Sequence, residues 1–135
     1  EPLLQNLLSD SQVQLTVVGV AHAEALSRWL GQSDAFLFVR GGVSSRRGTV
    51  IAAIAHGVPV VGYQSVETAW PITDAGVALV EFGDVEGLSR SLLRLARDPA
   101  WAAELRERHR QAYTQYFSWD RIAERVEAIL QQTTI

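Results

Sequence analysis

Three residue types are absent from this sequence, and two of these absences exclude whole classes of chemistry. There is no cysteine, which excludes thiol catalysis, disulfides and thiolate metal sites. All 12 basic residues are arginine, and the lack of lysine excludes Schiff-base catalysis and a Walker-type phosphate loop. Methionine is missing as well, and the sequence opens on Glu1. We therefore expect a piece of a longer protein.

Histidine is scarce, and neither sign of charge dominates. The three histidines (His22, His56 and His109) are far apart and show no zinc-ligand spacing, so nothing points to a metal, and no other cofactor is expected. A formal net charge of −3 argues against nucleic acid or an anionic membrane as a partner. No apolar run approaches the roughly 18 residues of a membrane span, and no signal segment opens the chain. We expect a cytoplasmic protein; peripheral attachment of the full-length form to the inner membrane stays open.

What is present is the pattern of one soluble α/β domain. The length of 135 residues, 47% of them hydrophobic and 20% charged, fits a single domain. The expected strands are residues 13–20, 35–39, 58–61 and 77–82. The expected helices are residues 23–30, residues 49–56 and three later segments that begin after Asp84, Asp98 and Ser118. Strands that are apolar throughout indicate a Rossmann-like parallel sheet with helices on both faces.

The helical spacing also predicts which side chains are buried. Three tryptophans are expected in the core, namely Trp29, Trp101 and Trp119. The last helix is expected to carry an inner apolar face of Ile122, Val126, Ile129 and Leu130. Residues 104–110 are rich in arginine and glutamate, a composition that indicates a solvated helix face.

The loop of residues 40–49 carries the most informative chemistry. It combines glycines, two serines and two adjacent arginines directly before a helix, at the carboxyl end of a strand, where open parallel sheets bind ligands. A helix N-terminus offers unpaired N–H groups, and arginine adds bidentate donors to phosphate oxygens. We therefore predict a diphosphate site at Ser44, Ser45, Arg46, Arg47, Gly48 and Thr49. The alternative is that the arginines only face solvent and Ser45 merely caps the helix.

Other candidates are weaker, and none is a convincing catalyst. Further contacts to the ligand are open for Val20, His22, Gly42 and Glu67. His56, at the end of a helix, is a charge or packing residue more often than a catalyst. Trp70 stands beside a proline in a loop and is the tryptophan for which ligand stacking stays open. No residue has the partner that a general base requires.

Several motifs in order resemble one family. Residues 53–61 (AIAHGVPVV) are similar to the family's small-residue helix and the strand after it. Residues 33–35 (SDA) are similar to the start of the strand before that helix. Residues 75–80 and residues 117–119 (FSW) are similar to later segments of the family. Over residues 13–130 the sequence resembles the C-terminal domain of the family-four retaining glycosyltransferases of the GT-B fold. Lysine-free, alanine- and arginine-rich composition is also typical of GC-rich bacterial genomes.

The resemblance implies a function, but this sequence lacks one motif of the family. It implies a domain that binds a nucleotide-diphospho-sugar, next to an N-terminal acceptor-binding domain of the same enzyme, and inactive by itself. The family's pair of glutamates, which reach the donor sugar and the ribose, falls here on Ser44 and Ala52. Phosphate binding transfers to this sequence, whereas sugar and ribose recognition do not. Two other readings stay open: a non-catalytic glycosyltransferase-like module, and a nucleotide-binding regulatory domain.

Overall fold

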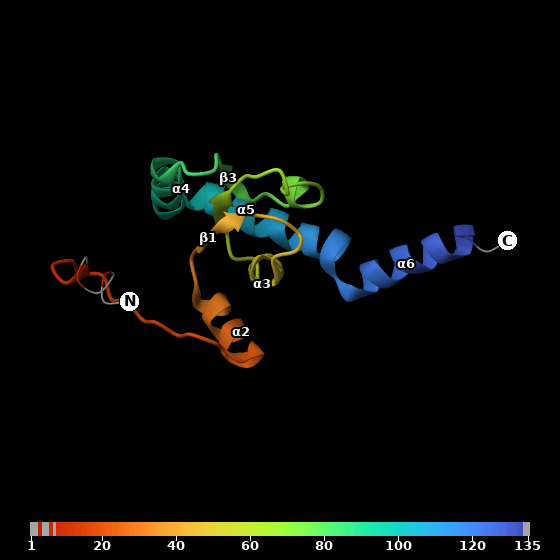
Figure 1. The fold of residues 1–135 in the computed structure, drawn as a ribbon, viewed down its shortest axis with the longest axis horizontal. Coiled ribbons are helices and arrows are strands. Elements are labelled where there is room, and N and C mark those ends of the chain that lie inside the picture. The colour runs from red at the N-terminus through yellow and green to blue at the C-terminus, as the bar shows by residue number, and fades with distance from the viewer. Residues whose placement is uncertain (1–2, 4–5, 7, 134–135) are drawn as a thin grey trace.

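A computed structural model describes residues 3, 6 and 8–133 of the chain. Across this part of the chain, three parallel strands form one sheet in the order β1-β2-β3. The strands are β1 (Phe36–Gly42), β2 (Val60–Tyr63) and β3 (Ala78–Val80). The helices are α2 (Ala23–Gln32), α3 (Gly48–Ala55), α4 (Val85–Arg97), α5 (Pro99–Ala112) and α6 (Trp119–Thr133), with short helical segments η1 (Ile72–Asp74) and η2 (Tyr113–Phe117). The predicted α/β, Rossmann-like fold class is confirmed (Figure 1).

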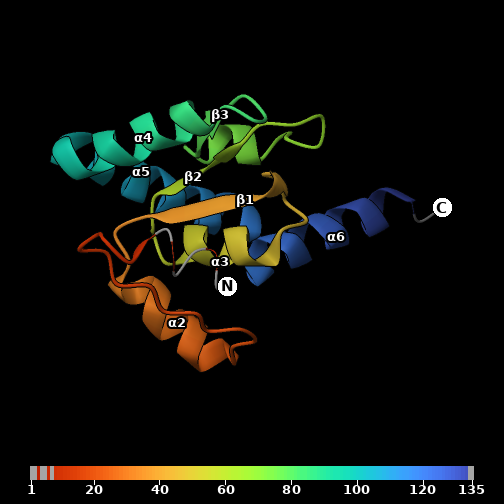
Figure 2. The ribbon, with the colours of Figure 1, turned by 60° about the vertical axis from the view of Figure 1, so that its left-hand side comes forward.

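Two hydrophobic cores lie on the two faces of the sheet. Val60 belongs to the first core, with Ile54 of α3 and Ile72 of η1. The next residue, Val61, belongs to the second core, with Leu88 of α4 and other α4 and α5 side chains. Successive side chains of a strand point to opposite faces, so β2 joins both cores. Figure 2 shows α3 and α4 on opposite sides of the strands.

The outer strand β1 is covered on only one face. Phe38 is buried in the first core, whereas Leu37 is 43% exposed and Val39 is 51% exposed. Burial of this strand on both faces was therefore a wrong expectation. The reason is position: β1 lies at the edge of the described sheet, and α4 packs on β2 and β3. An edge strand with an uncovered face leaves alternate side chains in solvent.

Residues 13–20 do not form the strand that their β-branched sequence predicts. They have no regular secondary structure, and Val17, Val18 and Val20 are exposed. A strand is stable only when a neighbouring strand takes up its backbone hydrogen bonds. The described sheet therefore has three strands, one fewer than expected.

The predicted helix caps are confirmed. Asp84 accepts a hydrogen bond from the N–H of Gly87 at 2.8 Å, at the start of α4. Asp98 accepts one from the N–H of Trp101 at 3.0 Å, at the start of α5. Ser118 accepts one from the N–H of Arg121 at 3.3 Å, at the start of α6. Each side chain satisfies a donor in a first helical turn, which the sequence around it specifies locally.

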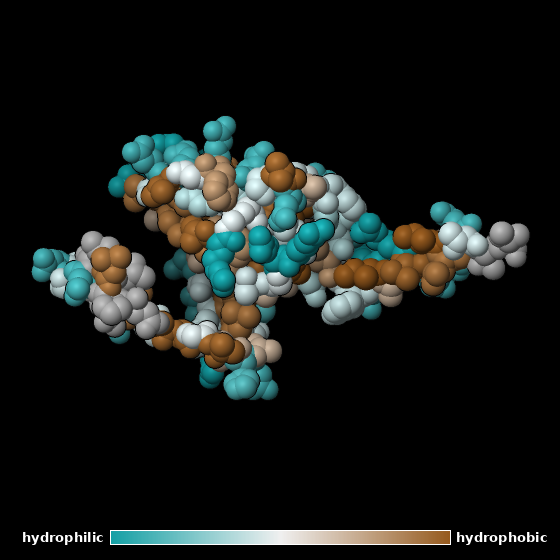
Figure 3. Space-filling view, in the orientation of Figure 1, coloured by the Kyte–Doolittle hydropathy of each residue, from teal (hydrophilic) through white to brown (hydrophobic). Residues whose placement is uncertain are grey.

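Helix α6 leads away from the body of the domain; of its predicted inner face Ile122 is partly buried, and the prediction is wrong for the other three side chains. Trp119 is 81% exposed, and Val126, Ile129 and Leu130 are also exposed. Figure 1 shows the helix projecting away, and Figure 3 shows hydrophobic side chains along it. Trp29 is exposed too, whereas Trp101 packs against the second core as expected. The amphipathic pattern predicted the helix but not its surroundings.

His109 corrects the expectation that residues 104–110 only face solvent. Its side chain is fully buried. Its Nδ1 donates to the carbonyl of Ala75 at 2.7 Å, and its Nε2 accepts from the N–H of Val60 at 3.1 Å. Burial lowers the pKa of His109 to about 4, although the hydrogen bond to Ala75 opposes that shift. A neutral imidazole thus joins α5 to the start of β2 and to the loop before β3.

Candidate functional site

The loops that follow β1 and β2 are tied together at the carboxyl edge of the sheet. The N–H of Val43 donates to the carbonyl of Tyr63 at 2.8 Å, which extends the pairing of the strands by one bond. Beyond it, the hydroxyl of Thr68 donates to the carbonyl of Val43 at 2.6 Å and accepts from the N–H of Ser65 at 3.0 Å. Thr68 therefore fixes the second loop, residues 64–69, on the first.

Gly42, one of the predicted donor contacts, makes this close approach possible. A Cβ at this position would overlap the Cβ and Oγ of Ser65. Gly42 is buried, so its role in the described structure is to leave room for the neighbouring loop. Contact between Gly42 and a ligand stays a prediction.

Two serines and two arginines turn the chain from β1 into α3. Ser44 is buried, with 2% of its surface exposed, and its carbonyl accepts from the N–H of Arg47 at 3.1 Å. Arg47, and not Ser45, occupies the N-cap position of α3, and its side chain forms no capping bond. The first turn contains Gly48 and Thr49, both exposed. Backbone N–H groups of a first turn have no acceptor within their own helix.

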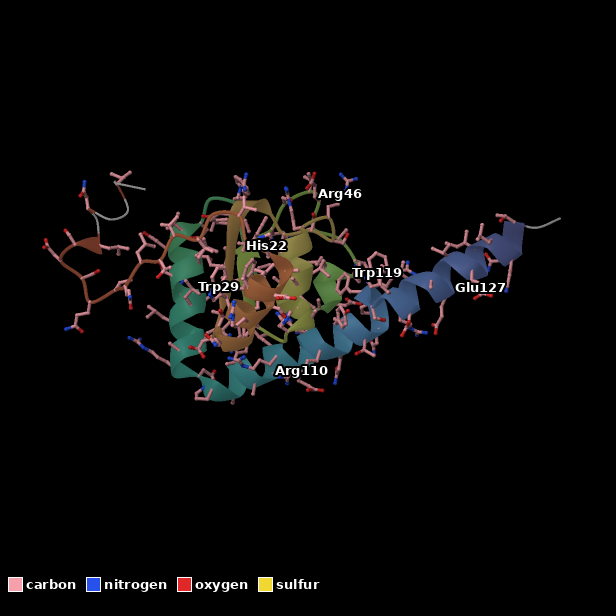
Figure 4. All side chains as sticks on the ribbon, turned by 90° about the horizontal axis from the view of Figure 1, so that it is seen from below. His22, Trp29, Arg46, Arg110, Trp119 and Glu127 are labelled. Carbon is pink, nitrogen blue, oxygen red and sulfur yellow. The ribbon has the colours of Figure 1, made fainter. Side chains whose placement is uncertain are left out.

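The predicted site residues line two neighbouring pockets. The smaller, of about 250 Å³, is lined by Ser44, Ser45, Arg46 and Glu67. The larger, an open groove of about 690 Å³, lies along β1 and is lined by residues 36–40 with Arg46, Arg47, Gly48 and Thr49. Arg46 borders both, and Figure 4 shows it at the rim of the domain with its side chain pointing outward. Val20 and His22 line neither pocket, and their contact with a ligand stays a prediction.

The two arginines differ in their surroundings. The Arg47 guanidinium lies over the ring of Phe38, 5.7 Å from its centroid, and its Nη2 is 3.7 Å from the Glu67 carboxylate. Its Nε is buried and has no hydrogen-bond partner in the described structure. For Arg46, by contrast, the described residues provide no ion-pair partner. This ion pair is not predictable from the sequence, because Arg47 and Glu67 belong to different loops.

The remaining candidates have structural partners. His56 donates from Nδ1 to the carbonyl of Ala52 at 2.8 Å and accepts at Nε2 from the Ser27 hydroxyl at 2.7 Å, so it is a packing residue. Trp70 packs edge-on against Tyr116 at 5.1 Å, with the Arg125 guanidinium over its ring. Among the described residues no group of three or more potential metal ligands occurs. No helix in that part is long and apolar enough to cross a membrane.

We expect Thr68→Val to loosen the link between the two loops. Valine has the shape of threonine without its hydroxyl, so the carbonyl of Val43 and the N–H of Ser65 both lose their partner. The expected loss in the free energy of unfolding is about 1–2 kcal/mol. Chemical denaturation measures it, and Thr114→Val on η2, where the hydroxyl binds only the carbonyl of Arg110, is the matched control. An equal loss in both variants would contradict a special role for Thr68.

Comparison with known proteins adds one relative. No protein-family model and no solved structure matches the chain. The chain is 30% identical over 137 residues to the GDP-mannose-dependent monoacylated alpha-(1-6)-phosphatidylinositol monomannoside mannosyltransferase of Corynebacterium glutamicum. The match covers 97% of this chain and 36% of the relative's length. Together with the parallel sheet flanked by helices, this similarity supports a glycosyltransferase-like domain.

Proposed function

We propose that this domain binds the diphosphate of a nucleotide-sugar donor and takes part in the transfer of the sugar. One observation carries the proposal: the residues of the Ser44–Thr49 turn, which follows the carboxyl end of β1, line two adjoining pockets. Open parallel sheets bind their ligands at this edge. The similarity to a mannosyltransferase supports the same assignment.

The chemistry of the turn suits a diphosphate. Arg46 and Arg47 offer charge-assisted donors, and the first turn of α3 adds backbone N–H groups and the positive end of its dipole. The hydroxyls of Ser45 and Thr49, both exposed, complete the set of donors. When the bond between the sugar and the diphosphate breaks, negative charge accumulates on the diphosphate. Donors that are already in position stabilise that charge at little reorganisation cost.

The relative suggests a donor to test, and the family resemblance suggests that a second domain is needed for sugar transfer. The relative is named as GDP-mannose-dependent, so GDP-mannose is the first donor to test. In the GT-B arrangement that the sequence resembles, a second domain binds the acceptor across a cleft. We therefore expect residues 1–135 to bind the donor without transferring its sugar. Sugar transfer by this chain alone would contradict a site shared between two domains.

Removal of either arginine is expected to weaken the binding of GDP about tenfold. The reason is that a charge-assisted hydrogen bond contributes about 1.5–3 kcal/mol, and each 1.4 kcal/mol changes the dissociation constant tenfold. Isothermal titration of GDP into the chain, and into its Arg46→Ala and Arg47→Ala variants, measures the effect. Arg97→Ala, at an exposed position on α4, is the matched control. Unchanged affinity in both site variants would refute the assigned site.

A second function is favoured by a specific feature of the turn. Ser44 and Ala52 stand where the resembling family carries glutamates, so the carboxylates for the sugar and the ribose are missing. This favours a glycosyltransferase-like module without catalysis, retained for structure or for a partner. The same titration separates the two functions: a folded chain that binds neither GDP nor GDP-mannose supports the non-catalytic module.

A further inference from the structure

Glu67 is a half-exposed carboxylate at the wall of a pocket whose other lining residues offer donors to anions. It lines the smaller pocket with Ser44, Ser45 and Arg46, and its carboxylate is 3.7 Å from Nη2 of Arg47. A negative charge at this point opposes the binding of a phosphate. A pocket that only attracted anions would bind them more tightly without this carboxylate, so Glu67 is expected to have a different role.

The loop that carries Glu67 is held in place by its own hydrogen bonds. The N–H of Glu67 donates to the Ser65 hydroxyl at 3.2 Å, and Thr68 joins the loop to the carbonyl of Val43 at 2.6 Å. The side chain of Arg47 has a donor to spare, since its buried Nε has no partner in the described chain. Arg47 can therefore exchange Glu67 for another anion while the loop that carries Glu67 stays in place.

We propose that Glu67 is an internal counter-ion that competes with the second phosphate of a diphosphate for Arg47. The inference rests on the proposed anion site and concerns what that site discriminates. A single phosphate between Ser44, Ser45 and Arg46 leaves the pair of Arg47 and Glu67 closed. A second phosphate lies toward the larger groove, which Arg47 lines, and reaches Arg47 only when the pair opens.

This competition has a consequence for turnover. A nucleoside diphosphate is the leaving group of the proposed transfer, and a site that held it too tightly would be slow to release it. Because the ion pair of Glu67 and Arg47 forms again as the diphosphate leaves, it lowers the free-energy cost of product release. Glu67 thus lowers the affinity of the site for a diphosphate, through competition for Arg47, more than its affinity for a monophosphate, on which it acts by repulsion alone.

The test compares GDP with GMP in the Glu67→Gln variant. Glutamine keeps the shape of the side chain and removes its charge. We expect the dissociation constant for GDP to fall about threefold, the scale of an exposed ion pair, and that for GMP to change by less than about twofold. Glu104→Gln, at an exposed position on α5 that lines neither pocket, is the matched control and should change neither. Unchanged GDP affinity, or equal tightening of both nucleotides, overturns the inference.

A second comparison shows whether Glu67 acts through Arg47. In an Arg47→Ala background there is no arginine for Glu67 and the phosphate to compete for, so Glu67→Gln should change the affinity for GDP by less than about twofold. Tightening of similar size in that background means plain repulsion of the ligand and overturns the inference. The proposed function fails separately: it is refuted if GDP does not bind the unmodified chain, or binds without regard to Arg46 and Arg47. Thermal unfolding of each variant confirms that only folded protein is compared.

Discussion

His109→Leu is expected to lower the free energy of unfolding by about 4 kcal/mol at pH 7. Leucine fills much of the same space but forms no hydrogen bond, so the N–H of Val60 and the carbonyl of Ala75 are left buried without a partner. An unsatisfied buried backbone group costs about 1–3 kcal/mol, and two are created here. Chemical denaturation of both proteins measures the difference. His22→Leu, at an exposed position, is the matched control and should change stability little.

The same residue should make stability depend on pH in the acidic range. An unfolded histidine titrates at its ordinary pKa of 6.5, whereas in the fold burial lowers the pKa of His109 to about 4. Between these two values the unfolded chain binds a proton that the folded chain excludes. The stabilisation is complete above pH 6.5 and is lost as the pH falls to about 4, by up to about 3 kcal/mol.

Geometry explains why the folded state resists this proton. The carbonyl of Ala75 requires a donor at Nδ1, and the N–H of Val60 requires an acceptor at Nε2. Only the neutral tautomer with its proton on Nδ1 satisfies both. Protonation would direct an N–H of the ring at the N–H of Val60. Denaturation of His109→Leu from pH 7 to pH 4 should lack this share of the pH dependence, and an unchanged pH dependence would contradict the assignment.

Local chemistry explains which parts of the fold could be predicted from the sequence. Asp84, Asp98 and Ser118 are predictable as caps because a cap acts within one helical turn. The prediction of a strand at residues 13–20 is wrong because a strand also depends on a neighbouring strand, which its own sequence does not specify. The exposure of Trp119 is unpredictable for the same reason. The burial of His109, by contrast, is indicated by the sequence. This histidine lies four residues after Leu105 and three before Ala112, both buried, on the apolar side of α5.

The candidate site shows the same division between local and distant information. Its turn from Ser44 to Thr49 could be predicted, because a glycine-rich segment between a strand and a helix is a local feature. The residue at the N-cap of α3 could not be predicted: Arg47, and not Ser45, takes that position. The ion pair with Glu67 and the bond from Thr68 to Val43 join separate loops. These contacts exist because parallel strands bring their carboxyl ends to one edge.

Gly42→Ala is expected to disturb both the fold and the site. The added methyl group would overlap the Cβ and Oγ of Ser65 and lie 3.2 Å from its backbone nitrogen. Both residues sit beside buried strand ends, so relief of the overlap requires the loop of residues 64–69 to move. Overpacking of this kind costs about 1–3 kcal/mol, and denaturation should show a loss near the upper end. Gly48→Ala, where an added Cβ meets nothing within 4 Å, is the control for a glycine in the same region.

The site should respond because the displaced loop carries Glu67 and Thr68. When this loop moves away, Glu67 withdraws from the Arg47 guanidinium, and the smaller pocket changes shape. The double variant Gly42→Ala/Ser65→Gly removes the overlapping atoms, so it should regain most of the lost stability and a coupling free energy of about 1–2 kcal/mol should appear in the double-mutant cycle. Additive losses would mean that Ser65 is not what the glycine accommodates. In that case the close approach of the two loops would not depend on Gly42, and GDP affinity should be the same in the single and double variants.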